Sequence, residues 1–104
     1  MPVTTDFDMA QMRESAGHAT QALKALAHED RLLLLCQLSQ EELCVSDLEG
    51  QLDIRQPSLS QQLGILRKQG LVDTRREGKH IYYRIADERI QRMLETMYGL
   101  YCEP

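Results

Sequence analysis

The stretch that decides the fold is QPSLSQQLGILRKQG, residues 56–70. Leu59, Leu63 and Leu66 recur at the i, i+4, i+7 spacing of one helix face, so they predict a buried stripe. A solvated helix surface usually interleaves Glu and Lys, which favour helix and pair at i, i+4. This stretch has no acidic residue, and its other positions carry mainly Ser, Gln, Arg and Lys. The composition indicates a helix whose outer face meets a partner other than water.

A second, shorter helix is predicted just upstream. Residues 41–53 hold Ser46 as a plausible N-cap with Glu49 three positions on, which is the spacing of a capping box. A turn follows, and Pro57 is expected at the first position of the next helix, where its missing N–H costs nothing. Gly70 is expected to end that helix. The two segments predict a helix-turn-helix.

The pattern changes from helix to strand after Gly70. Leu71–Arg75 and His80–Ile85 are two β-type runs, and the segment REGK between them supplies a Gly-containing turn. We therefore expect a β-hairpin with a basic tip that carries Arg75, Arg76, Lys79 and His80.

Three further helices complete the predicted chain. Residues 8–27 carry a narrow, Ala-rich stripe, residues 28–39 open with acids and continue apolar, and residues 87–102 end the chain. The first stripe consists of Met12, Ala16, Ala19, Leu23 and Leu26, and the last of Ile90, Leu94, Met97 and Tyr101. The predicted fold class is mainly α with a β-hairpin wing, a winged helix-turn-helix, in a single domain over residues 1–104.

Charge is distributed unevenly along the chain. The net charge is −4, yet residues 46–85 hold seven basic and five acidic residues. The excess of acid therefore lies outside the helix-turn-helix and the hairpin. Such asymmetry indicates a basic working surface on an acidic body.

A DNA partner explains the outer face of the helix predicted over residues 57–69. In a helix-turn-helix the second helix enters the major groove with its N-terminal residues against base edges. Gln offers a donor and an acceptor that can pair with adenine, Ser can serve several bases, and cations suit phosphate. The predicted DNA-binding residues are Arg55, Gln56, Ser58, Ser60, Gln61, Gln62, Arg67, Lys68, Arg75, Arg76, Lys79 and His80. We therefore expect double-stranded DNA as the partner.

Cysteine content and hydropathy indicate a cytoplasmic protein without a membrane partner. Three cysteines are few for a secreted domain held together by disulfides, and three is an odd number. The N-terminal segment is polar and acidic, and the apolar run LLLLC (32–36) is far too short to span a bilayer. We expect free thiols in a reducing compartment.

The run from LKALAHEDRL through QPSLSQQLGILRKQGLV to REGKHIYYRI (23–85) resembles the ArsR/SmtB family of bacterial winged-helix repressors. The resemblance covers nearly the whole chain. It implies a homodimer held by the first and last helices, bound to an inverted-repeat operator. It also implies an inducer that lowers the affinity for DNA.

Metal sites of that family fit this sequence poorly. One type needs two thiolates in a CVCDL run, whereas this chain has CVSDL, with Cys44 present but Ser46 in place of the second thiol. Another uses Asp and His on the last helix, but no His follows His80. His18 and His28 are isolated from one another, so we expect no metal site and no cofactor.

The remaining cysteines match a narrower, persulfide-sensing subgroup of the family. Cys36 and Cys102 fall on the two positions that in those repressors become joined by a disulfide or a longer sulfur chain. The resemblance implies redox sensing by this pair with reactive sulfur species as the inducer, and Cys44 matches neither position. Packing alone could account for Cys36, since free Cys is often a small buried hydrophobe.

The sequence is also compatible with other functions. A metal- or arsenite-responsive repressor is the alternative within the DNA-binding class, and a dimerisation module that never touches DNA is another. An enzyme is disfavoured, because the sequence has no phosphate loop, Gly-x-Ser-x-Gly elbow or metal-hydrolase motif.

Overall fold

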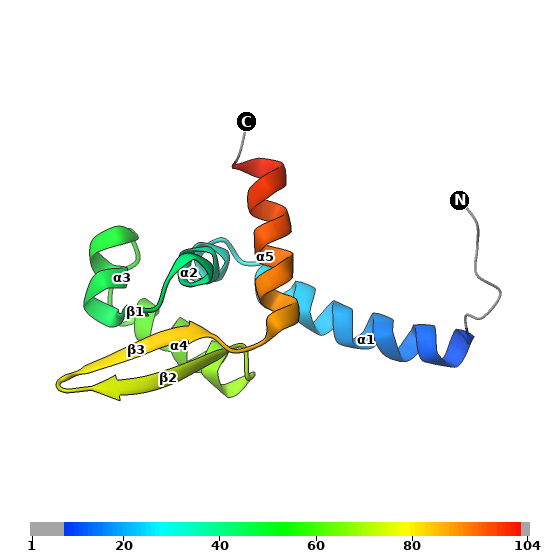
Figure 1. Cartoon of the computed structure of the whole chain (residues 1–104), viewed down its shortest axis with the longest axis horizontal. Helices are drawn as coiled ribbons and strands as arrows, with labels where there is room; N and C mark the ends of the chain where they lie inside the picture. Colours follow the sequence, from blue (N-terminus) through cyan, green and yellow to red (C-terminus); the bar gives the residue numbers. More distant parts are fainter. Residues whose placement is uncertain (1–7, 103–104) are drawn as a thin grey trace.

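The computed structural model describes residues 8–102, and it confirms the predicted winged helix-turn-helix (Figure 1). A three-stranded antiparallel sheet lies beside α2, α3 and α4, while α1 and α5 extend away from this body. The elements are α1 (Met9–Leu26), α2 (Glu29–Gln40), β1 (Leu43–Cys44), α3 (Val45–Gln51), α4 (Ser58–Lys68), β2 (Val72–Glu77), β3 (His80–Ile85) and α5 (Glu88–Tyr101).

The apolar stripe of α4 is buried as predicted. Leu59, Leu63 and Leu66 are each at most 1% exposed, and they join the core formed with α2, α3 and α5. Burial of a leucine side chain stabilises a fold by about 1.5–3 kcal/mol, so this stripe fixes how α4 sits on the body. The opposite face of α4 is therefore left to solvent.

Gly70 ends α4 by a Schellman motif. Its φ is 77°, the left-handed conformation that glycine adopts without a steric penalty. The Gly70 N–H donates to the Arg67 carbonyl, and the Leu71 N–H donates to the Leu66 carbonyl, both at 3.0 Å. The predicted stop is confirmed, and it turns the chain directly into β2.

The start of α4 lies one residue later than predicted. The helix begins at Ser58, and Pro57 precedes it as the N-cap, so the prediction that Pro57 is the first helical residue was wrong. Proline has no side-chain oxygen to cap the helix. Instead the Gln56 side chain accepts from the Ser60 N–H at 3.1 Å, which supplies the missing cap.

The predicted capping box of α3 was also wrong. The N-cap is Cys44, not Ser46, and the Asp47 carboxylate accepts from the Cys44 backbone N–H at 3.2 Å. The reason is that β1 pairs with β3 up to Cys44, so the chain leaves the sheet there and turns at once into α3. Glu49 is exposed on the helix and takes no part in the cap.

The wing is a hairpin of β2 and β3 to which a third strand is added. The sheet order is β1-β3-β2, with Leu43 opposite Tyr83 and Cys44 opposite Tyr82. Gly78, at φ 62°, makes the tight turn between Glu77 and His80. The two-residue strand β1 was not predicted from the sequence, and it joins the wing to the helical body.

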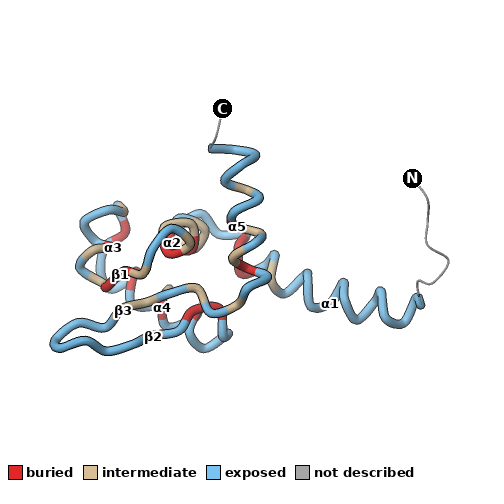
Figure 2. The backbone as a smooth tube through the Cα atoms, viewed as in Figure 1, coloured by how far each residue is buried: buried red, intermediate tan, exposed pale blue. Residues whose placement is uncertain are grey.

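Apolar surface remains uncovered on the two terminal helices. On α1 only Ala25 and Leu26 are buried, and most of the predicted stripe is exposed, Leu23 by 55% (Figure 2). On α5 Ile90 and Leu94 are buried, whereas the C-terminal turn exposes Leu100 by 72% and Tyr101 by 85%. More than half of the surface of each of these three side chains is therefore open to solvent in the single chain.

Candidate nucleic-acid interface and thiol pair

The exposed face of α4 presents an amide, a hydroxyl and two cations. Gln61 lies opposite the buried leucine stripe, with Ser60 beside it, and both are exposed. Arg67 and Lys68 are exposed in the last turn of the helix. The N-terminal half of α4 thus carries uncharged polar side chains, which suit contacts with bases, and the C-terminal half carries cations, which suit contacts with phosphates.

Three of the predicted DNA-binding residues are less available to DNA than Gln61. Ser58 and Gln62 are half-buried, and the Gln62 Oε1 is buried with no hydrogen-bond partner among the described residues. Gln56 is exposed, but its side chain is engaged as the cap of α4. Among the predicted amides, Gln61 is therefore the one most available to a base edge.

Ile65 is a surface residue that the sequence reasoning missed. It lies on α4 one turn beyond Gln61 and is 40% exposed. An apolar side chain on the reading face is suited to contact with a thymine methyl group. Ile65 lies outside the spacing of Leu59, Leu63 and Leu66, and this was the signal in the sequence that it is not part of the buried stripe.

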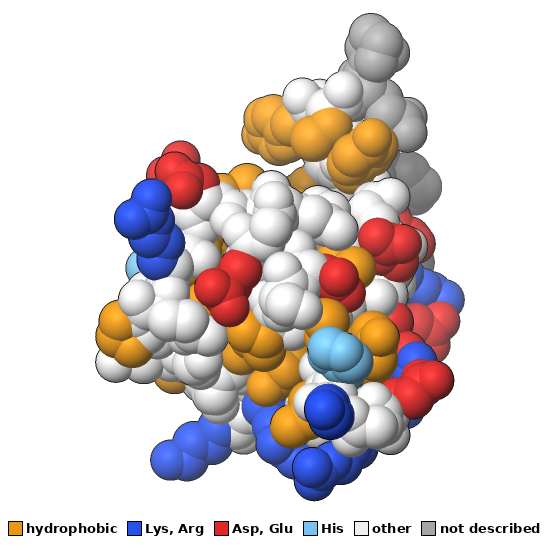
Figure 3. All heavy atoms as spheres, turned by 90° about the vertical axis from the view of Figure 1, so that its left-hand side faces the viewer, with side chains coloured by type: hydrophobic (Ala, Val, Ile, Leu, Met, Phe, Trp, Pro, Cys, Tyr) orange, Lys and Arg blue, Asp and Glu red, His pale blue; other side chains and the backbone are white. Residues whose placement is uncertain are grey.

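The wing carries exposed basic residues at its tip. Arg76, Lys79 and His80 are exposed, and Arg55 is exposed in the turn before α4. Figure 3 shows Lys and Arg side chains gathered along the lower margin of the molecule, on the side where α4 and the wing lie. This surface carries the local basic charge that the sequence predicted.

Arg75 differs from its basic neighbours on the wing because its side chain is paired with two carboxylates. Its Nε donates to Glu42 Oε1 at 2.6 Å, its Nη1 donates to Glu77, and its Cζ lies 4.9 Å from the centre of the Tyr82 ring. The hydrogen bonds to the two carboxylates, first to Glu77 and then to Glu42, raise the pKa of the guanidinium.

Cys36 and Cys102 lie on two helices, α2 and α5, that are in contact. Cys36 is half-buried in α2, Cys102 is exposed at the end of α5, and both thiols are free. The two helices are in contact, and the Gln91 side chain of α5 donates to the Ser39 carbonyl of α2 at 3.0 Å. Partial burial, and then the charge of Cys102, raise the pKa of Cys36.

Cys44 is held in a different way. It is buried, its Sγ–H donates to Asp47 Oδ2 at 3.1 Å, and its Sγ lies 3.1 Å from the Ser46 hydroxyl. The thiol hydrogen bond lowers the pKa of Asp47. A buried thiol whose proton is engaged by a carboxylate is poorly placed for attack on a dissolved reagent.

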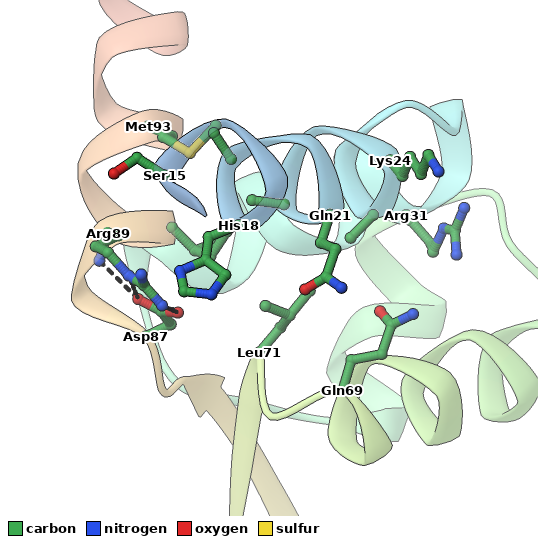
Figure 4. Close-up of a pocket in the computed structure, with 14 residues that line it drawn as sticks. Ser15, His18, Gln21, Lys24, Arg31, Gln69, Leu71, Asp87, Arg89 and Met93 are labelled. Atoms are coloured by element: carbon green, nitrogen blue, oxygen red, sulfur yellow. Dashed lines mark hydrogen bonds and ion pairs between the residues drawn. The ribbon is translucent and has the colours of Figure 1, made fainter. Parts of the chain in front are cut away.

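A groove of about 920 Å³ runs between α1 and the body (Figure 4). His18, Gln21 and Lys24 line its α1 side, and Asp87 pairs with Arg89 at its α5 end. The groove holds one histidine and one carboxylate among its lining residues, which is too few nitrogen, sulfur and oxygen ligands for a closed metal site.

Two kinds of feature are absent from residues 8–102. That range contains no group of three or more His, Cys, Asp or Glu side chains placed to hold a metal ion. No helix within it has the length and apolar character needed to cross a membrane.

The fold, the exposed face of α4 and the basic wing define a DNA-binding protein of the winged helix-turn-helix class. The family model of the arsR family of bacterial regulatory proteins matches residues 28–74. A biofilm growth-associated repressor of Agrobacterium fabrum is 48% identical over 95% of this chain and 85% of its own length. The chain belongs to the ArsR family of bacterial regulatory proteins.

Solved structures agree with this assignment. The repressor BigR from Xylella fastidiosa superposes with a TM-score of 0.84 at 40% identity, covering 92% of this chain and 98% of that one. Reduced HlyU from Vibrio cholerae superposes with a TM-score of 0.84 at 39% identity, covering 88% of this chain and 97% of that one. The chain is thus a regulatory protein of the ArsR family, similar in sequence and structure to these two proteins.

Proposed function

We propose that the protein is a dimeric repressor that binds an inverted-repeat operator and is released when Cys36 and Cys102 react with persulfide or polysulfide. The observation that carries the proposal is the contrast among the three thiols. Two of them lie on α2 and α5, helices that are in contact, while Cys44 is buried and bonded to Asp47. One relative is described in a reduced form, which is consistent with a redox-active protein.

The dimer is proposed from the uncovered apolar surface of the terminal helices. Leu23 on α1, and Leu100 and Tyr101 on α5, are more than half exposed in the single chain. A chain of this size buries a modest core, so covering such side chains with a second copy adds stability. Dimer symmetry then places two copies of α4 about one helical turn of DNA apart, roughly 34 Å.

The proposed chemistry begins at the exposed thiol. Cys102, as thiolate, attacks a sulfane sulfur of the persulfide, the S–S bond of the reagent breaks, and the reagent leaves as a thiol. Cys36, as thiolate, then attacks the modified Cys102. A disulfide forms when Cys102 carries one added sulfur and its own Sγ is attacked. A trisulfide forms when polysulfide has left two added sulfurs on Cys102 and the inner one is attacked. In both cases hydrosulfide leaves, so two thiols are oxidised and sulfane sulfur is reduced.

Fluorescence anisotropy with DNA from upstream of the gene tests the proposal. Reduced protein should bind an inverted repeat there with nanomolar-range affinity typical of specific sites, and polysulfide should weaken that binding. A reducing agent added afterwards should restore it. Tight binding that polysulfide leaves unchanged would support a repressor with another inducer.

The basic tip of the wing should contribute nonspecific phosphate contacts. Arg76→Ala or Lys79→Ala should weaken binding to all sequences alike, because phosphates carry no base information. Each lost contact should reduce the slope of log K against log salt by about one unit. Salt titrations measure this slope, with Arg13→Ala on α1 as an exposed arginine control. An unchanged slope in both wing variants would remove these residues from the interface.

A metal-responsive repressor is the alternative, and zinc distinguishes it. Stoichiometric zinc or cadmium should leave the reduced protein on its DNA, because Ser46 stands where a second thiolate would be needed and the described part of α5 has no histidine. Elemental analysis of purified protein together with anisotropy checks this expectation. Tight metal binding with release of DNA would replace the persulfide proposal by the metal one.

A further inference from the structure

Arg75 lies in a row of side chains that crosses the whole sheet. It is opposite Tyr82 in the pairing of β2 with β3, and Tyr82 is opposite Cys44 in the pairing of β3 with β1. Residues directly opposite in antiparallel strands share a face, as do residues two apart along one strand. Glu42, two residues before Cys44, and Glu77, two after Arg75, are therefore on the same face.

The Arg75 side chain bridges the two edges of this sheet. From β2 its guanidinium passes over the Tyr82 ring of β3, with Cζ 4.9 Å from the ring centre, and reaches Glu42 next to β1 at 2.6 Å. A second nitrogen bonds Glu77 on its own strand. The planar guanidinium is suited to all three contacts at once, which the compact ammonium of a lysine is not.

We propose that Arg75 is a positioning residue that ties the wing to the helical body, and that it is not one of the cations that neutralise DNA phosphate. The proposal rests on the proposed DNA-binding function and refines it. It removes Arg75 from the predicted contact residues and adds Glu42, an acid, to those that determine affinity.

The short strand β1 explains why the Arg75–Glu42 contact is needed. β1 pairs with β3 through two residues only, so few backbone hydrogen bonds fix the angle of the wing. The bridge from Arg75 to Glu42 adds a charged contact at that junction. If Arg75 moved to a phosphate, Glu42 and Glu77 would be left uncompensated near the negatively charged DNA, which disfavours that movement.

Removal of Glu42 gives opposite results under the two roles of Arg75. If Arg75 positions the wing, the bridge to Glu42 is needed for binding, so Glu42→Ala should weaken operator affinity roughly two- to fivefold. If Arg75 instead contacts phosphate, Glu42→Ala frees the guanidinium and tightens binding. Glu41→Ala is the matched control, because it removes the same charge from the adjacent exposed residue and reports the long-range effect alone.

Arg75 variants provide the second measurement. Arg75→Ala should weaken binding with an unchanged salt slope, Arg75→Lys should not restore it, and Glu42→Ala should have no additional effect in the Arg75→Ala background. A slope reduced by about one unit, with recovery in Arg75→Lys, would overturn the proposal.

Hydrogen exchange separates this proposal from the proposed function. In protein without DNA, Glu42→Ala should speed amide exchange in β1 and β3 relative to Glu41→Ala. Unchanged exchange would refute the positioning role of Arg75 even if the protein binds its operator. Faster exchange in a protein that binds no upstream DNA would support the tie while refuting the proposed function.

Discussion

Protein with Cys102→Ser should bind operator DNA as tightly as the parent when reduced and should not be released by polysulfide. The parent should lose about 5–150-fold in affinity under the same treatment, the range of a coupling free energy of 1–3 kcal/mol. The reason is that serine cannot form the bridge to Cys36, while the exposed position of residue 102 makes the substitution harmless to the fold. Anisotropy before and after treatment measures both numbers.

The bridge should act through the contact between α2 and α5. Gln91 already bonds the Ser39 carbonyl, and Cys36 and Cys102 lie further along the same two helices. A direct disulfide requires Cα atoms about 4.4–6.8 Å apart, whereas a longer sulfur chain tolerates a wider gap. Covalent joining would restrict the angle of α5, and in the proposed dimer that angle sets the spacing of the two copies of α4.

Two further cysteine variants make the result specific. Cys36→Ser should behave like Cys102→Ser, and Cys44→Ser should still respond to polysulfide. Mass spectrometry of the treated parent should show a Cys36–Cys102 linkage, with added sulfur if the bridge is longer than a disulfide. If Cys102→Ser were released as readily as the parent, the two-thiol mechanism would be wrong.

Locally encoded features of the fold were predictable from the sequence. The buried stripe of Leu59, Leu63 and Leu66 and the stop at Gly70 follow from spacing and from the conformational freedom of glycine, and the structure confirms both. Strand β1 depends on pairing with Tyr82 and Tyr83, far along the chain, and a run of two residues carries no period of its own. The cap of α3 was missed for the same reason.

The candidate site shows the same division between local and distant interactions. Residue types on α4 and the wing indicated a surface for DNA, but the burial of Gln62 and the capping role of Gln56 depend on the exact placement of the helix. The partner of Arg75 is Glu42, 33 positions away, and no local pattern connects them. The chemistry of the surface was thus predictable, whereas the side chains already occupied within the fold were not.

Gln61→Ala should cause the largest loss of sequence preference of any single change on α4. Gln61 is exposed opposite the leucine stripe, where its amide can donate to and accept from an adenine edge. Loss of such a bidentate contact costs about 1–3 kcal/mol against the best site, or roughly 5–150-fold in affinity, and nothing against unrelated DNA. Gln62→Ala should have a smaller effect, because its side chain is half-buried.

Anisotropy against the operator and a set of half-site variants measures this preference. Gln69→Ala is the matched control, since it makes the same chemical change at the exposed C-cap of α4, away from the proposed base edges. The ratio of specific to nonspecific affinity should fall in Gln61→Ala and stay constant in Gln69→Ala. Equal ratios in both variants would place the base contacts elsewhere on α4, with Ser60 and Ile65 as the exposed side chains next to be replaced.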